Sequence, residues 1–292
     1  MNAIQSQNFS VVLRSAGRFA MQWRLLLLWL AVLLIPTALM IFPIWHVFGD
    51  QLDHSIYAAE LAQRLDSNSA HDLFSAIQLN AIAVHTSGIA GIIATLLLSP
   101  FLSGAVITAA KAPAQLSFGQ LIHGGITEYG RLLRLLVWAI VPLGVAAGVG
   151  SGAMYLAGKF AQKAILESSA DLANNAALAF SMILFFIVDA AVDAGRAQFA
   201  LSSKRRSAIK ALWQGIKLVC KRPLTSLGLY FLLTLIGFAV AGLLSVLRIN
   251  LPQAGIAGFT IALLLAQLTV AAIAWLRGAR LFALIQLAKP SE

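Results

Sequence analysis

The sequence predicts an all-α membrane protein, a polytopic bundle of six transmembrane helices with amphipathic helices on its cytoplasmic side. The first observation is composition: 60% of the 292 residues are hydrophobic and only 11% are charged, whereas soluble domains carry about 25% charged and 45–50% apolar residues. The second is that the apolar runs are continuous, whereas barrel strands alternate over about 10 residues. These features exclude an ordinary soluble enzyme and a disordered chain, and the single cysteine excludes a disulfide scaffold.

Six stretches reach the length of about 20 apolar residues that crosses a hydrocarbon core. They are Leu25–Trp45, Ser87–Ala110, Leu135–Gly158, Ala173–Val192, Leu224–Leu247 and Gly255–Leu276. The fourth is the weakest, because Asp189 lies inside it. Pro36, Pro100 and Pro142 are compatible with spans, since neighbouring helices satisfy the carbonyls that a proline frees.

The basic residues predict the orientation of the chain. With these spans, 17 of the 21 Lys and Arg residues fall on one side. Cytoplasmic segments of membrane proteins carry an excess of Lys and Arg, and the number of spans is even. We therefore expect a protein of the bacterial inner membrane with both termini in the cytoplasm. The first span exceeds the apolar core of a signal peptide, about 7–15 residues, so we expect it to be retained.

An amphipathic segment precedes the first, third and fifth spans. Apolar residues recur at helical spacing within 9–23, 118–129 and 209–220, which is typical of interfacial helices. We expect a single membrane domain of three units, each an interfacial helix followed by a hairpin of two spans. The units cover approximately residues 1–110, 111–195 and 196–292. The alternative is that any basic, apolar junction shows such a pattern.

Membrane lipids of the anionic inner leaflet are the expected partner. Basic side chains beside such a leaflet contribute about 1 kcal/mol each. The headgroup contacts we expect are Lys204, Arg205, Arg206, Lys210 and Lys217. For Lys204–Arg206, a solvated charge run is the alternative. The positions of the charges explain the net +10 without nucleic acid as a partner.

Polar groups at membrane depth are the next candidates. Asp189, Asp193 and Arg196 are spaced i,i+4 and i,i+3, so they share one helix face, and such charges face the bundle interior or water. We interpret them as an ion pair that ends the fourth span, and a proton or cation path is the alternative. Gln267, deep in the sixth span, is placed to hydrogen-bond across helices.

Glycines at four-residue intervals mark the third span. Gly144, Gly148 and Gly152 form a doubled GxxxG pattern, and glycine at this spacing allows helix backbones to approach closely. We therefore predict a packing face for another helix of the bundle or of a second protomer.

Catalytic signatures are missing from the sequence. It has no P-loop, Rossmann fingerprint, HExxH, CxxC or nucleophile elbow. Four histidines lie in or beside the external loop, at His46, His54, His71 and His85. Their spacing is loose for a metal site, so a solvated loop is the better interpretation. We expect no enzyme activity, no metal and no cofactor.

The layout of Ala190–Tyr230 combines an acidic end to the fourth span, the helix Ser207–Lys217 with Trp213, and a new span at Pro223. In this it resembles the YciC-like bacterial inner-membrane proteins, and the membrane region fused to some glycerophosphodiester phosphodiesterases. The resemblance covers the whole topology and rests on layout. It implies a six-helix inner-membrane protein and transfers no catalytic residue, because no soluble barrel domain is present.

These observations favour a non-enzymatic scaffold or accessory subunit in envelope or lipid handling, associated with a membrane protein or with a second copy of the chain. The alternative is a small transporter or channel whose path is lined by Asp189 or Gln267. A lipid-modifying enzyme that uses the external His and Asp residues ranks last.

Overall fold

The computed structural model describes residues 9–53, 55, 67–112, 114–201, 207–251 and 255–289, and every regular element in these ranges is an α-helix. In chain order the helices are α1 (Phe9–Ala20), α2 (Trp23–Leu52), α4 (Ser67–Leu79), α5 (Ala81–Lys111), α6 (Phe118–Ala161), α7 (Glu167–Leu201), α8 (Ala208–Lys221), α9 (Pro223–Asn250) and α10 (Gly255–Ala288). Helices α2, α5, α6, α7, α9 and α10 are long and apolar enough to cross a membrane. They contain the six predicted spans, so the all-helical, multi-pass class is confirmed.

Local signals start several of these helices. The Ser117 hydroxyl accepts a hydrogen bond from the Gln120 N–H, and the Gln120 side chain accepts one from the Ser117 N–H, which makes a capping box before α6. Ser207 caps α8 in the same way, by accepting from the Lys210 N–H. Pro223 occupies the first position of α9, where a backbone N–H would have no acceptor within the helix, so proline loses no hydrogen bond.

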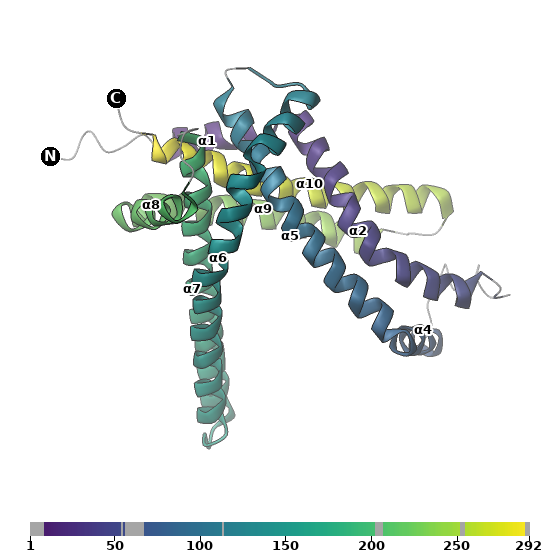
Figure 1. The fold of residues 1–292 in the computed structure, drawn as a ribbon. Helices are drawn as coiled ribbons and strands as arrows, with labels where there is room; N and C mark the ends of the chain where they lie inside the picture. Colours follow the sequence, from purple (N-terminus) through teal and green to yellow (C-terminus); the bar gives the residue numbers. More distant parts are fainter. Residues whose placement is uncertain are drawn as a thin grey trace.

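The six long helices pair as three hairpins: α2 with α5, α6 with α7, and α9 with α10. The hairpins meet at one end and diverge toward the other (Figure 1). This shape gives the 31.1 kDa chain an accessible surface of 18,260 Å², whereas a compact soluble protein of that mass exposes about 12,000 Å². Most of each hairpin therefore has no protein neighbour on its outer part.

The buried core lies where the hairpins meet, and we call this region the hub. Its largely buried segments are residues 102–107 of α5, 190–199 of α7 and 281–285 of α10. Helices α1 and α8 pack against it through small residues, among them Ala16 and Ala211, which are fully buried. The hub therefore holds the three hairpins together.

Close contacts between glycines join the helices of the hub. A Cβ on Gly104 of α5 would lie 3.1 Å from Gly125 Cα of α6. Gly215 of α8 lies directly on Gly195 of α7, and a Cβ on Gly215 would lie 2.6 Å from the carbonyl oxygen of Ala191. These contacts let the helix axes approach more closely than larger side chains permit.

Helix α1 closes the hub by packing on α10. The Trp275 indole donates a hydrogen bond to the Gly17 carbonyl oxygen at 3.0 Å, and a Cβ on Gly278 would lie 3.6 Å from Ala20 Cβ. Each amphipathic segment thus packs on the second spanning helix of another hairpin: α1 on α10, the first turns of α6 on α5, and α8 on α7. The unit boundaries predicted from the sequence stay a prediction.

The second amphipathic segment differs from its predicted form. It is the start of α6, a single helix of 44 residues, about 66 Å long, and not a separate interfacial helix. Gly124 and Gly125 do not end it, because both are buried against α5, where Thr108 and Phe101 occupy the space that a Cβ would need.

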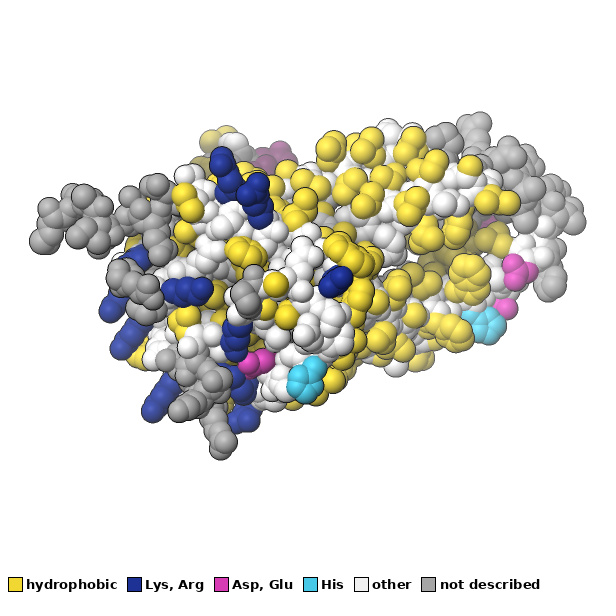
Figure 2. All heavy atoms as spheres, turned by 90° about the horizontal axis from the view of Figure 1, so that it is seen from above, with side chains coloured by type: hydrophobic (Ala, Val, Ile, Leu, Met, Phe, Trp, Pro, Cys, Tyr) yellow, Lys and Arg dark blue, Asp and Glu magenta, His cyan; other side chains and the backbone are white. Residues whose placement is uncertain are grey.

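The charges are separated in space as they are along the chain. Most Lys and Arg side chains visible in Figure 2 lie over one half of the molecule, and apolar side chains cover most of the other half. We call the first half, which contains the hub, the basic end.

Candidate functional site

Two acidic side chains and one basic side chain of α7 lie on the face that their spacing predicts. Asp193 Oδ1 lies 2.5 Å from Arg196 Nη1. The side chain of Asp193 is 11% exposed and that of Asp189 is 37% exposed. Partly buried charges of this kind are tolerated when they are paired and hydrogen-bonded. Asp193 is paired with Arg196, and the partners of Asp189 come from other helices.

Tyr230 of α9 joins the two carboxylates. Its hydroxyl lies 2.7 Å from Asp189 Oδ2 and 2.9 Å from Asp193 Oδ2, and it accepts a hydrogen bond from Arg280 Nη1 of α10 at 3.0 Å. The Arg280 guanidinium also lies over the Tyr230 ring, 4.3 Å from its centroid. Asp189, Asp193, Arg196, Tyr230 and Arg280 form what we call the charged cluster, in which two arginines balance two carboxylates.

A second buried ion group links α5, α6 and α7. Glu128 accepts from Lys111 Nζ at 2.9 Å and from Arg131 Nη1 at 2.7 Å. The Arg131 guanidinium lies 4.6 Å from the centroid of the Phe199 ring. The group cross-links helices of two hairpins inside the hub.

The charged cluster forms part of the wall of a cavity of about 340 Å³, which we call the hub cavity. Helices α2, α5, α6, α7 and α10 contribute its lining, which includes Trp29, Thr95, Leu96, Ser99, Ser103, Leu143, Phe185, Asp189, Asp193, Arg196, Arg277 and Arg280. Leu96, Leu143 and Phe185 line the part of the cavity farther from the basic end, together with Thr95, and the apolar residues Val106, Leu136 and Leu281 complete its lining nearer the hub. The hub cavity therefore has its charged residues toward the hub, among apolar ones, and a mainly apolar lining toward the diverging hairpins.

Two buried donors of residues in this wall have no acceptor within the described part of the chain. Trp29 Nε1 and Arg280 Nε form no hydrogen bond with any described residue, although Trp29 is only 4% exposed. Buried polar atoms are almost always paired, and an indole N–H and a guanidinium are donors only. Two residues of the wall therefore carry a donor without an acceptor among the described residues, while both carboxylates already have partners.

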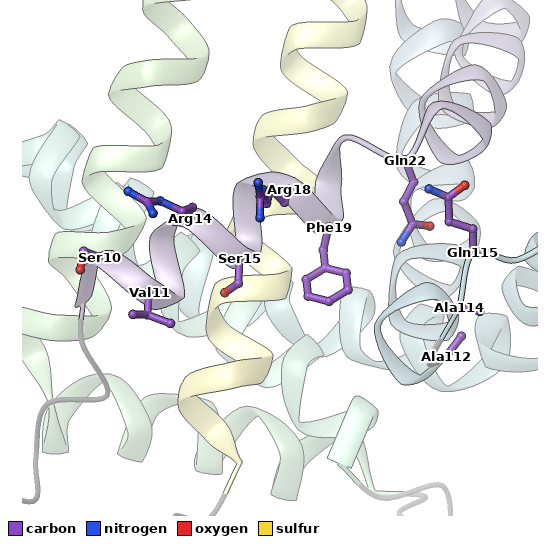
Figure 3. Close-up of a pocket in the computed structure, with 10 residues that line it drawn as sticks. All are labelled: Ser10, Val11, Arg14, Ser15, Arg18, Phe19, Gln22, Ala112, Ala114 and Gln115. Atoms are coloured by element: carbon purple, nitrogen blue, oxygen red, sulfur yellow. The ribbon is translucent and has the colours of Figure 1, made fainter.

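A shallower hollow of about 700 Å³ lies beside α1, and we call it the basic hollow. Figure 3 shows Arg14 and Arg18 on one side of α1 and Val11 and Phe19 on the other. Among the described residues, its lining includes no acidic side chain. This arrangement suits the boundary between headgroups and acyl chains.

The predicted glycine stripe does not pack inside the described part of the chain. A Cβ on Gly144, Gly148 or Gly152 would meet no atom within 4 Å. The seam of α6 against α7 lies instead at Gly150, where a Cβ would be 3.0 Å from Ser181 Oγ. The register of α6 turns the stripe outward, away from the other described helices. Packing against a second protomer stays a prediction.

The other predicted residues lie apart from the hub cavity. Gln267 is half-buried on α10 and has no hydrogen-bond partner among the described residues. Lys210 and Lys217 are exposed on α8, with Lys217 Nζ 5.7 Å from the centroid of the Trp213 ring. Lys204, Arg205 and Arg206 lie outside the described residues.

The histidines form no metal centre in the described part of the chain. His46 Nδ1 lies 3.4 Å from Asp50 Oδ1, and no group of three metal-ligating side chains occurs among the described residues. His54 lies outside them.

Sequence reasoning missed Tyr230, Arg280, Glu128 and Trp29. Tyr230 and Arg280 belong to helices distant along the chain from Asp189, so spacing could not pair them. A usable signal was present in Arg280, a basic residue just after the sixth predicted span and on the same side of the membrane as the acidic end of the fourth.

Comparisons with protein-family models, with curated proteins and with solved structures found no match to this chain. The resemblance to the YciC-like proteins therefore stays a prediction.

Proposed function

We propose that this protein is a non-enzymatic scaffold or accessory subunit of the bacterial inner membrane that acts in envelope or lipid handling. Both termini lie in the cytoplasm, and the basic end rests against the anionic inner leaflet. The excess of Lys and Arg at one end supports this orientation. Of the residues expected to contact headgroups, Lys210 and Lys217 lie in the described part of the chain and are exposed on α8, which supports this role.

The observation that carries the proposal is the unpacked outer part of the three hairpins. Large apolar side chains are exposed along them, for example Val145 (62%), Phe238 (58%) and Ile92 (57%). The glycine stripe of α6 faces the same open space. Lipid is sufficient to cover exposed apolar side chains. Three glycines on one helix face also expose backbone, which suits the close approach of another helix, from a membrane-protein partner or a second copy of the chain.

Solubilisation in a mild detergent, followed by sizing of the complex, tests this proposal. The wild-type chain should migrate as a complex with a membrane protein or with itself. Gly148→Leu should release the chain as a monomer, because the side chain blocks the close approach. Gly242→Leu is the matched control: its Cβ also meets nothing within 4 Å, but it lies on α9, so the complex should persist.

A wild-type chain that is monomeric from the first extraction would overturn the proposal, and so would a complex that survives Gly148→Leu. The transporter alternative is supported by Asp189 in the wall of the hub cavity, whereas Gln267 lies elsewhere. Ion or solute flux in liposomes that Asp189→Asn abolishes would favour that alternative, and flat traces would favour the scaffold.

A further inference from the structure

The donors of the hub cavity converge from three helices. Trp29 of α2, Ser103 of α5 and Arg280 of α10 all line it, and Trp29 Nε1 and Arg280 Nε are buried without an acceptor. Arg277, one turn before Arg280, also lines the cavity and forms no ion pair with a described residue. A bound group that supplies acceptors would satisfy all three basic or indole donors.

The charges of the lining decide whether the bound group is an anion or a cation. The lining holds three arginines and two aspartates, and the aspartates are already engaged by Arg196, Tyr230 and Arg280. Three of the four carboxylate oxygens are thereby occupied, and among the described lining residues a cation would find one unpartnered carboxylate oxygen, Asp189 Oδ1. An anion would find Arg277 unpaired and two buried N–H groups free, and guanidinium groups bind phosphate oxygens through paired hydrogen bonds.

The apolar part of the cavity indicates what carries the anion. Leu96 and Phe185 line it and are each 50% exposed, so the cavity reaches the open space between the α2–α5 and α6–α7 hairpins. Its volume of about 340 Å³ accommodates a small polar headgroup, while acyl chains would have to lie outside, along the exposed apolar faces of the two hairpins.

We propose that the hub cavity binds the phosphate group of an anionic lipid, with the lipid chains lying between these two hairpins. Arg277, Arg280 and Trp29 donate to the phosphate oxygens. This inference deepens the proposed role in lipid handling and rests on it, because it names the lipid class that the protein holds.

Native mass spectrometry of the full chain in detergent tests the proposal by counting bound phosphatidylglycerol. Wild-type protein should retain one tightly bound molecule in preference to phosphatidylcholine. Arg277→Gln and Trp29→Phe should each weaken this binding by about tenfold, since each removes a hydrogen bond to a charged group. Arg134→Gln and Trp138→Phe are the matched controls, because both residues are exposed on α6 and outside the cavity, and they should leave binding unchanged.

Thermal unfolding without added lipid tests whether the Trp29→Phe variant is folded. Trp29→Phe should still unfold in one cooperative transition, at a temperature somewhat below that of the wild type, because the smaller ring leaves space in the core. Added phosphatidylglycerol should raise the unfolding temperature of the wild type more than that of Trp29→Phe.

Equal binding by the wild type and both cavity variants would overturn the proposal. So would displacement of the lipid by millimolar inorganic phosphate, which would assign the cavity to a soluble anion. Failure of the complex-sizing experiment with selective lipid binding retained would remove the scaffold role alone, whereas loss of selectivity with an intact complex would remove only the lipid site.

Discussion

Tyr230 is the residue on which the charged cluster depends. It is 1% exposed, contacts both carboxylates and Arg280, and packs edge-on against the Phe186 ring, 5.1 Å between centroids. In an apolar interior, a polar group that loses its partner costs more than the hydrogen bond contributes when formed. One hydroxyl therefore holds α7, α9 and α10 in register.

Tyr230→Phe should lower the free energy of unfolding by about 1–3 kcal/mol, because the buried Asp193 and the half-buried Asp189 lose their shared donor. Tyr155→Phe is the control, since Tyr155 is 61% exposed on α6 and should change the free energy little. Unfolding in mixed micelles of increasing denaturing detergent measures both. Equal effects of the two substitutions would show that the Tyr230 hydroxyl contributes nothing specific.

At this scale the sequence predicts local relations and misses distant ones. The shared face of Asp189, Asp193 and Arg196 follows from helical periodicity alone. Their contacts with Tyr230 and Arg280 depend on how α9 and α10 cross α7, which no spacing along the chain encodes. The free indole N–H of Trp29 was equally invisible, because the absence of a partner is a property of the folded hub.

At the scale of the helices, some glycines pack against a neighbouring helix and others do not. Gly195 and Gly215 face each other across α7 and α8, whereas Gly144, Gly148 and Gly152 face open space. The two kinds look alike in sequence, because a spacing of four residues defines a helix face without saying what covers it. The start of α6 was predicted as a separate helix for a similar reason: its amphipathic spacing defines a helix face without showing that the helix continues into the third span.

Gly215→Ala and Gly130→Ala should change stability in opposite directions. A Cβ at position 215 would lie 2.6 Å from the Ala191 carbonyl oxygen, so α8 must shift, at a cost of about 1–3 kcal/mol. Gly130 has nothing within 4 Å of its Cβ position, and alanine favours the helix there by about 1 kcal/mol. Thermal unfolding in detergent compares them, and a shift of the same sign in both would contradict the contact between α7 and α8.

The whole molecule is open because its solvent is lipid. The sequence predicts the six spans, since their length and apolar character are local properties. It does not predict that the hairpins diverge, because acyl chains are as apolar as leucine and a lipid-facing surface has the same composition as one facing another helix. Among the described residues, the contacts between hairpins are concentrated in the hub, where charges and glycines meet.

The topology, with the basic end in the cytoplasm, is tested most directly by the single native cysteine. Cys220 is exposed at the end of α8, and Ile165, between α6 and α7, is fully exposed at the opposite end. In intact cells a membrane-impermeant maleimide should leave the wild-type chain unlabelled until the membrane is permeabilised. It should label Ile165→Cys, made together with Cys220→Ser, without permeabilisation. Labelling of Cys220 in intact cells, with Ile165→Cys protected, would contradict the account.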